Sequence, residues 1–211
     1  MKTYLFDFDG TLVDSMPTYG AMMLSILQEH KATYGADILR IITPLGYPLT
    51  AEYFIKHCGV KASQQDLINT MKERAQKAYA TTIPAKAHVP EVLRALKAKG
   101  CSLNVLTASP HTMLDPCLKR LGLFDLFDHV WSCEDFGTGK SNPKIYHMAA
   151  QKLGCAVGDV IFLDDNLGAD TTAKAAGMTV WGVFDESSRD DAAKIKAVAD
   201  RYIYNFSELL A

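Results

Sequence analysis

Short runs of hydrophobic and β-branched residues recur along the chain, and most of them are separated by helix-length segments. The runs cover residues 3–8, 102–107, 129–132, 159–163 and 178–184, and the helix-length segments cover 88–99, 110–121, 142–154 and 166–176. Short strands that alternate with helices are typical of a parallel sheet with crossover helices. The pattern therefore predicts an α/β fold.

A 70-residue segment after the first predicted strand departs from this alternation. Residues 15–84 show helix-like periodicity at 16–30, 50–58 and 64–80, with almost no strand-like run. Both boundaries are short and contain proline, which suits hinges between two compact units. The sequence thus predicts a Rossmann-like parallel-sheet core, formed by residues 1–14 and 85–211, with an inserted all-helical cap domain over residues 15–84.

Composition and charge narrow the classes of function. The 211 residues include 22 Lys and Arg and 24 Asp and Glu, for a formal net charge of −2. This balance argues against nucleic-acid binding, which favours a strongly basic face. No run reaches the ~18 apolar residues of a membrane span, and early acidic residues argue against a signal peptide. Five scattered cysteines without a CxxC pair favour reduced thiols in a cytoplasmic protein over a disulfide framework or zinc site.

Two carboxylates follow the first predicted strand. Alternation along the strand places Asp7 and Asp9 on the same side at its carboxyl end, and Gly10 permits a sharp turn. Two like charges raise at least one pKa unless a cation lies between them. Asp and Gly are also common in ordinary strand-ending turns. Because open α/β sheets bind ligands outside the carboxyl ends of their strands, the position favours a ligand site.

Other polar residues follow the remaining strands. Thr107 and Ser109 follow the second strand, Asp164 and Asp165 follow the fourth, and Lys140 precedes a predicted helix. Taken singly, the hydroxyls and acids are explained as helix caps and the lysine as a solvated surface residue. Together, the carboxylates suit a hard cation such as Mg²⁺, while the hydroxyl, the ammonium and backbone N–H groups suit a phosphoryl group.

Four segments of the chain resemble the motifs of the haloacid dehalogenase-like (HAD) hydrolase superfamily, in the same order. They read DFDGTLVDS, LTAS, GKSNPKIYHMAAQKLG and VIFLDDNLGADTTAKAAGM. The helical insertion after the first motif resembles the cap of the phosphoglycolate phosphatase and phosphoglucomutase-like branch. The resemblance implies a Mg²⁺-dependent phosphatase that acts on a small soluble phosphate ester, with the cap closing to exclude water.

The resemblance also implies roles for individual residues. Asp7 is expected to be the nucleophile that forms an aspartyl-phosphate, and Asp9 the acid and base for the leaving alcohol and the water. The Asp7 carboxylate, the Asp9 main-chain carbonyl and the Asp165 carboxylate are expected to bind Mg²⁺. Asp164 is expected either to bind the ion directly or to contact one of its ligands.

Phosphate binding is expected from three further positions. The Thr107 and Lys140 side chains would hold the phosphoryl oxygens, and the backbone N–H groups of Phe8, Asp9 and Ala108 would assist.

Several positions depart from the family pattern. Ser141 replaces the first proline of the usual KPxP motif, and Asp164 stands where Gly or Glu is frequent. Tyr19 stands where mutase members have a His. Phosphonatases have a cap Lys, but no Lys occurs around residues 46–48 here. Dehalogenases generally lack the second acid of the first motif, which is present here as Asp9. These departures favour phosphomonoester hydrolysis. A β-phosphoglucomutase-type sugar-phosphate mutase and a catalytically silent binding protein stay open as alternatives.

The substrate is expected to depend on cap residues, which lack a family motif. Aromatic and Met side chains there are more often helix-bundle core than pocket lining. The residues in question are Tyr19, Met22, Tyr47 and Tyr53. A monomer is the default expectation for capped members.

Overall fold

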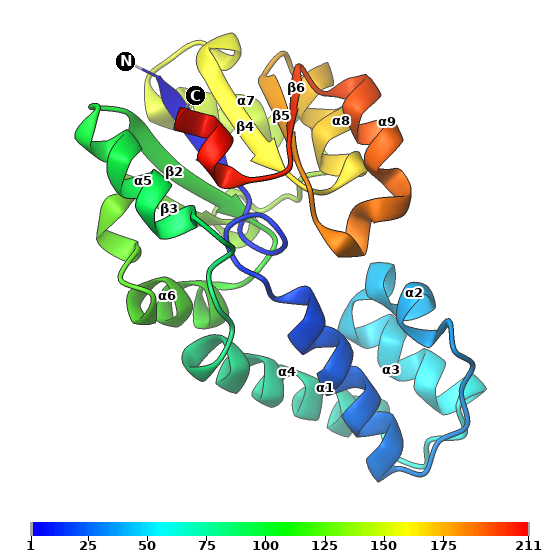
Figure 1. Ribbon diagram of the computed structural model, residues 1–211. Coiled ribbons are helices and arrows are strands. Elements are labelled where there is room, and N and C mark those ends of the chain that lie inside the picture. The colour runs from blue at the N-terminus through cyan, green and yellow to red at the C-terminus, as the bar shows by residue number, and fades with distance from the viewer. Residues whose placement is uncertain (1, 211) are drawn as a thin grey trace. The chain divides into compact units, whose positions relative to one another are not determined.

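The computed structural model describes residues 2–210, apart from the side chain at position 44. Close contacts divide the chain into two units, Met1–Asp14 with Ile83–Ala211, and Ser15–Thr82 (Figure 1). The second boundary lies two residues before the position expected from the sequence. Ile83 and Pro84 belong to the first unit because their carbonyl groups accept hydrogen bonds from the Arg120 guanidinium and the Asp14 N–H.

Within the described residues, the first unit contains a six-stranded parallel sheet in the order β3-β2-β1-β4-β5-β6. The strands are β1 (Thr3–Phe6), β2 (Ser102–Thr107), β3 (His129–Ser132), β4 (Val160–Asp164), β5 (Thr179–Val183) and β6 (Arg201–Ile203). β1 lies between β2 and β4 and is buried along its whole length, which explains why it reads as one hydrophobic run. The predicted α/β fold with a parallel sheet is confirmed.

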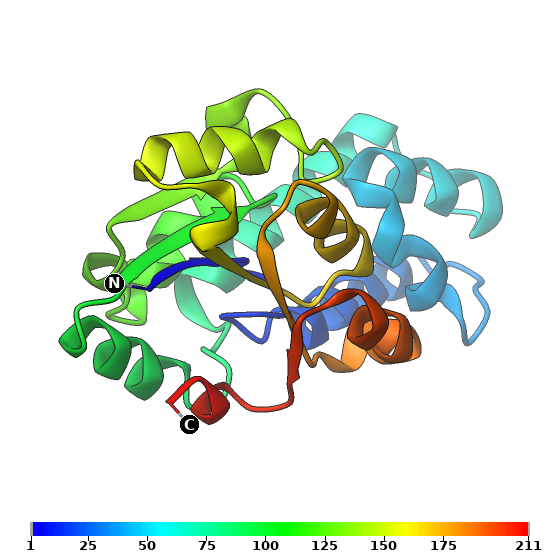
Figure 2. The same ribbon diagram turned by 90° about the horizontal axis from the view of Figure 1, so that it is seen from above.

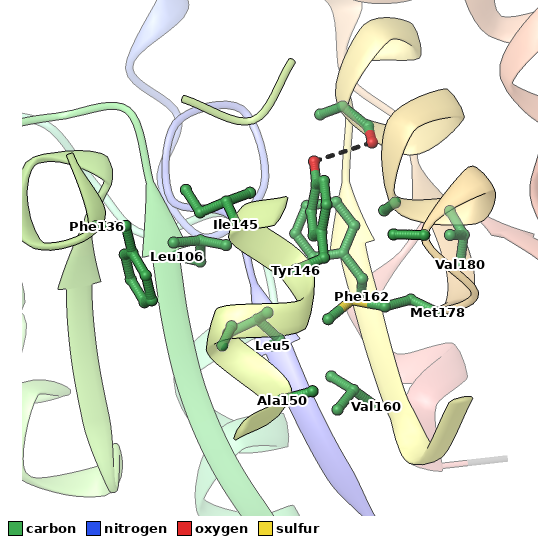
Figure 3. Packing of buried hydrophobic residues seen from close by; sticks show 14 residues of the cluster. Leu5, Leu106, Phe136, Ile145, Tyr146, Ala150, Val160, Phe162, Met178 and Val180 are labelled. Atoms are coloured by element: carbon green, nitrogen blue, oxygen red, sulfur yellow. Dashed lines mark hydrogen bonds between the residues drawn. The ribbon is translucent and has the colours of Figure 1, made fainter. Parts of the chain in front are cut away.

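Helices cover both faces of this sheet, and α5 and α7 lie on opposite sides of it (Figure 2). α7 and α8 pack on the face that carries Leu5, Leu106 and Phe162 (Figure 3). The other face carries Tyr4 and Phe6, and the Phe6 ring contacts Phe206 near the C-terminus. The helices of this unit are α5 (Val89–Ala98), α6 (His111–Arg120), α7 (Lys144–Leu153), α8 (Leu167–Ala175) and α9 (Ala192–Val198).

The described part of the second unit is helical. Its helices are α1 (Met16–Glu29), α2 (Ile38–Ile42), α3 (Gly46–His57) and α4 (Gln64–Thr81). They pack around an apolar core of their own, and a two-pronged ion pair from Arg74 to Glu29 joins α4 to α1. The four cap side chains expected to decide the substrate, Tyr19, Met22, Tyr47 and Tyr53, are partly buried against this core. Among the described helices, none combines the length and hydrophobicity required to cross a membrane.

Candidate active site

The carboxyl ends of β1 and β4 bring the first carboxylates together. Phe6 pairs with Leu163, and the Asp7 N–H donates to the Leu163 carbonyl at 2.8 Å. Continuing this register places Asp7 opposite Asp164, and strand alternation directs both side chains toward the face covered by α7 and α8. Asp165 follows directly. The three carboxylates are buried, and one oxygen of each lies within 4.8 Å of the others.

Lys140 supplies the positive charge of this group. Its Nζ donates to Asp7 Oδ1 and, at 2.8 Å, to Asp164 Oδ2, with only 13 % of the side chain exposed. Lys140 precedes α7, and the Tyr146 hydroxyl of α7 lies 3.0 Å from the Lys140 carbonyl that accepts its hydrogen bond. The packing of α7 therefore fixes the backbone that carries the ammonium group.

Burial and mutual repulsion shift the titration of these groups. Burial raises the pKa of Asp7 to about 7; Lys140 opposes this shift, whereas Asp164 and Asp9 add to it. Burial, then Asp164 and Asp7, raise the pKa of Asp165 well above its usual range. Burial alone would lower the pKa of Lys140, but Asp164 and Asp7 outweigh it and hold this pKa above its ordinary value.

This donor set fits a divalent cation. If all three carboxylates are ionised, they exceed the one ammonium group by two negative charges, which a dication would balance. All the side-chain donors are oxygens, the type that Mg²⁺ prefers over softer metals. Asp7, Asp164 and Asp165 are the residues that could hold the ion.

The loop after β1 closes around one of these carboxylates. Gly10 has a φ of +74°, and a Cβ at this position would lie 2.6–2.7 Å from the carboxylate atoms of Asp165. The Thr11 hydroxyl donates to Asp165 Oδ1 at 3.2 Å. Only glycine combines this backbone conformation with so close an approach.

Asp9 occupies a different position from the three clustered carboxylates. Its Oδ2 accepts a hydrogen bond from the Ser109 hydroxyl, in the loop after β2. Thr107, the last residue of β2, is buried, and its Oγ1 accepts from the Ser109 N–H at 3.1 Å, whereas Ala108 is exposed. Ser109 thus joins Asp9 to the segment that carries the expected phosphate-binding positions.

Comparison with known proteins places this geometry in a family. A model described as haloacid dehalogenase-like hydrolase matches residues 1–177. The chain belongs to this family. Hexitol phosphatase B of Escherichia coli K12 is 27 % identical over 213 residues, covering 98 % of this chain and 93 % of that protein. Phosphoglycolate phosphatase of Pectobacterium atrosepticum is 27 % identical over 184 residues, covering 84 % and 78 %.

A solved structure agrees along almost the whole chain. The HAD family hydrolase of Deinococcus radiodurans R1, determined with bound phosphate and sodium, superposes with a TM-score of 0.80 at 25 % identity, covering 99 % of this chain and 93 % of that one. The predicted family is therefore confirmed. The phosphatase names of the two relatives agree with the predicted enzyme class, a phosphoric monoester hydrolase.

Sequence reasoning about the HAD motifs missed several residues around the site. Asp170 of α8 is fully buried, and neither of its carboxylate oxygens has a hydrogen-bond partner among the described residues. Burial, then Asp164 and Asp165, raise the pKa of Asp170 to about 9. Lys86 was also missed; it lies outside the motif segments, whereas Asp170 lies within the fourth segment, where the sequence did not distinguish it as a buried acid. Ser109 also belongs to a motif segment; its hydroxyl was noted in the sequence, but its hydrogen bond to Asp9 was not predicted.

Proposed function

We propose that this protein is a Mg²⁺-dependent phosphatase that hydrolyses a small-molecule phosphomonoester through an aspartyl-phosphate on Asp7. The observation that carries the proposal is the buried Asp7 carboxylate at the end of β1, hydrogen-bonded to Lys140 and grouped with Asp164 and Asp165. A nucleophile beside an ammonium group and a cation site meets the main requirements of phosphoryl transfer, which are positioning and charge neutralisation.

The reaction proceeds in two displacements at phosphorus. An Asp7 carboxylate oxygen attacks phosphorus, the ester P–O bond breaks, and Asp9 gives its proton to the departing alkoxide oxygen. A water molecule then attacks phosphorus, Asp9 takes up the proton of that water, and release of phosphate regenerates the Asp7 carboxylate. The Ser109 hydroxyl orients Asp9 for both proton transfers.

The phosphoryl oxygens would be held by Lys140, Thr107 and the Ala108 N–H. The clustered carboxylates and the Asp9 main-chain carbonyl would hold Mg²⁺, which would supply positive charge for the phosphoryl group. The names of the relatives favour a small polyol or hydroxy-acid monophosphate as the substrate.

Release of p-nitrophenol from p-nitrophenyl phosphate, with MgCl₂ or with EDTA, tests the proposal. We expect turnover that requires Mg²⁺ and falls by at least about a thousandfold in Asp7→Asn. Asp128→Asn is the matched control, because Asp128 forms a partly exposed ion pair with Lys97 outside the site. Isomerisation of a hexose phosphate without phosphate release would instead indicate a mutase. Mg²⁺ binding without turnover of any ester in a broad panel would indicate a binding protein.

A further inference from the structure

Lys86 forms a junction between two loops at the carboxyl edge of the sheet. Its Nζ donates to the Gly10 carbonyl at 2.6 Å, to the Phe184 carbonyl at 2.7 Å and to Asp185 Oδ2 at 2.9 Å. An ammonium group has three protons, so these three bonds use all its donors. The Lys86 side chain is 19 % exposed and the Asp185 side chain 6 %, so this is not a solvated surface ion pair.

The backbone around Lys86 is bonded to the loop that follows β1. The Lys86 N–H donates to the Leu12 carbonyl, and the Asp14 N–H donates to the Pro84 carbonyl, both at 3.0 Å. Val13 and Ala85 form an antiparallel bridge between these bonds. The segment that returns from the second unit therefore runs beside the segment that leaves the first unit, and Lys86 extends that pairing to Gly10.

The acceptors of Lys86 belong to the loops that surround the carboxylates. Gly10 follows Asp9 and lies against the Asp165 carboxylate, where no Cβ fits. Phe184 and Asp185 follow β5, the strand that pairs with β4. Asp185 is fixed in turn, because its Oδ1 accepts from the Ser187 N–H at 2.9 Å. A shift of the Gly10 peptide would consequently remove the backbone contact that limits the position of the Asp165 carboxylate.

We propose that Lys86 is a positioning residue of the active site, which ties the loop after β1 to the loop after β5 and thereby holds Asp165 in place for Mg²⁺. The assignment rests on the proposed function. Lys86 touches no reacting group; it acts through Gly10. Groups that orient metal ligands commonly change metal affinity or activity by about 10- to 100-fold when they are removed.

The test compares Lys86→Met with Lys97→Met. Both changes remove an ion-paired lysine, but Lys97 pairs with Asp128 away from the site. Isothermal titration calorimetry measures the Mg²⁺ dissociation constant of the free protein, and p-nitrophenyl phosphate hydrolysis gives kcat and KM. For Lys86→Met we expect a dissociation constant raised about tenfold and kcat reduced, with KM within about twofold of wild type. Lys97→Met should leave all three unchanged.

Asp185→Asn provides a second approach that leaves the Lys86–Gly10 bond in place, and we expect a smaller rise in the Mg²⁺ dissociation constant. If Lys86→Met fails to fold, this variant still decides the question. Unchanged Mg²⁺ affinity in the folded variants would overturn the proposal. Tighter Mg²⁺ binding by Lys86→Met would overturn it as well, because the loss of the Lys86 positive charge would then affect Mg²⁺ binding more than any change in the position of Asp165. A wild-type protein that binds Mg²⁺ without hydrolysing any ester refutes the phosphatase proposal but leaves the calorimetric test of Lys86 intact.

Discussion

Replacement of Gly10 by Ala introduces one methyl group into the narrowest contact of the site. The added Cβ would lie 2.6 Å from Asp165 Oδ2 and 2.7 Å from two further carboxylate atoms. Ordinary van der Waals contact begins at 3.4 Å, so the carboxylate must retreat by about 0.8 Å, the difference between these two distances. A misplacement of about 1 Å in a catalytic group can reduce activity about a hundredfold.

Gly100 provides the matched control for this change. Its φ of +76° is close to the +74° of Gly10, but no heavy atom of the described residues lies within 4 Å of the position that a Cβ would take there. Both substitutions should therefore destabilise the first unit by about 1–2 kcal/mol, the cost of a left-handed backbone for a residue with a Cβ. Only Gly10→Ala should also displace Asp165, and we expect its Mg²⁺ affinity to fall at least about tenfold.

Two measurements separate these effects. Urea unfolding followed by tryptophan fluorescence reports on the first unit alone, because the chain has two tryptophans, Trp131 in β3 and Trp181 in β5. Calorimetric titration with Mg²⁺ reports on the carboxylates. Equal Mg²⁺ affinities of Gly10→Ala and Gly100→Ala would refute the displacement of Asp165, and so would losses of affinity in both variants that follow their losses of stability.

Three further changes test the surroundings of the site. His111→Gln should lower the free energy of unfolding mainly below about pH 6.5. The hydrogen bonds of His111 to Asp115 and Asp135 raise the pKa of His111, and their stabilising effect is lost as pH rises through that raised value. Urea unfolding at acidic and alkaline pH measures the difference. In EDTA, wild-type protein should lose stability as pH rises from the ordinary carboxyl pKa to about 9, because folded Asp170 keeps a proton that the unfolded chain releases. Asp170→Asn should not show this loss, and urea unfolding across this pH range compares the two proteins. Tyr146→Phe should cost about 1–3 kcal/mol, because it removes the one hydroxyl proton that lies between the carbonyls of Lys140 and Ala169. It should also lower activity through Lys140; unfolding and kinetic assays together check both effects.

Much of the sheet follows from local pattern, because buried strands are short apolar runs bounded by turns and glycine. The ranges predicted for β2 and β3, 102–107 and 129–132, are those of the structure. β6 escaped prediction because only three residues form it, and its pairing depends on contacts with β5 such as the Arg201 guanidinium over the Trp181 ring. α2 has five residues and is also too short to show a helical periodicity in the sequence.

Convergence of the candidate site was predictable in outline but not in detail. Parallel strands end at one edge, so residues after β1 and β4 were expected to meet there. That Asp7 and Asp164 are direct neighbours depends on strand order and register, which local sequence does not encode. Lys86 bonds to Gly10, Phe184 and Asp185, which are distant in sequence, and its own neighbourhood does not mark a buried cation. Asp170 lies in the fourth motif segment, five residues after Asp165, but the local sequence does not show that its carboxylate is buried.

The charged site and the apolar core of this protein are coupled through one side chain. The Tyr146 ring packs edge-on against Phe162 of β4 (Figure 3), as the two labelled rings show. The Tyr146 hydroxyl lies within hydrogen-bond distance of the carbonyls of Lys140 and Ala169. Lys140 in turn separates Asp7 from Asp164, which otherwise would face each other as buried like charges. An ionised carboxylate is costly to bury unless a counter-charge is held close to it. Core packing around Tyr146 is therefore part of the electrostatics of the site, and substitutions that loosen α7 should weaken ion pairing before they unfold the sheet.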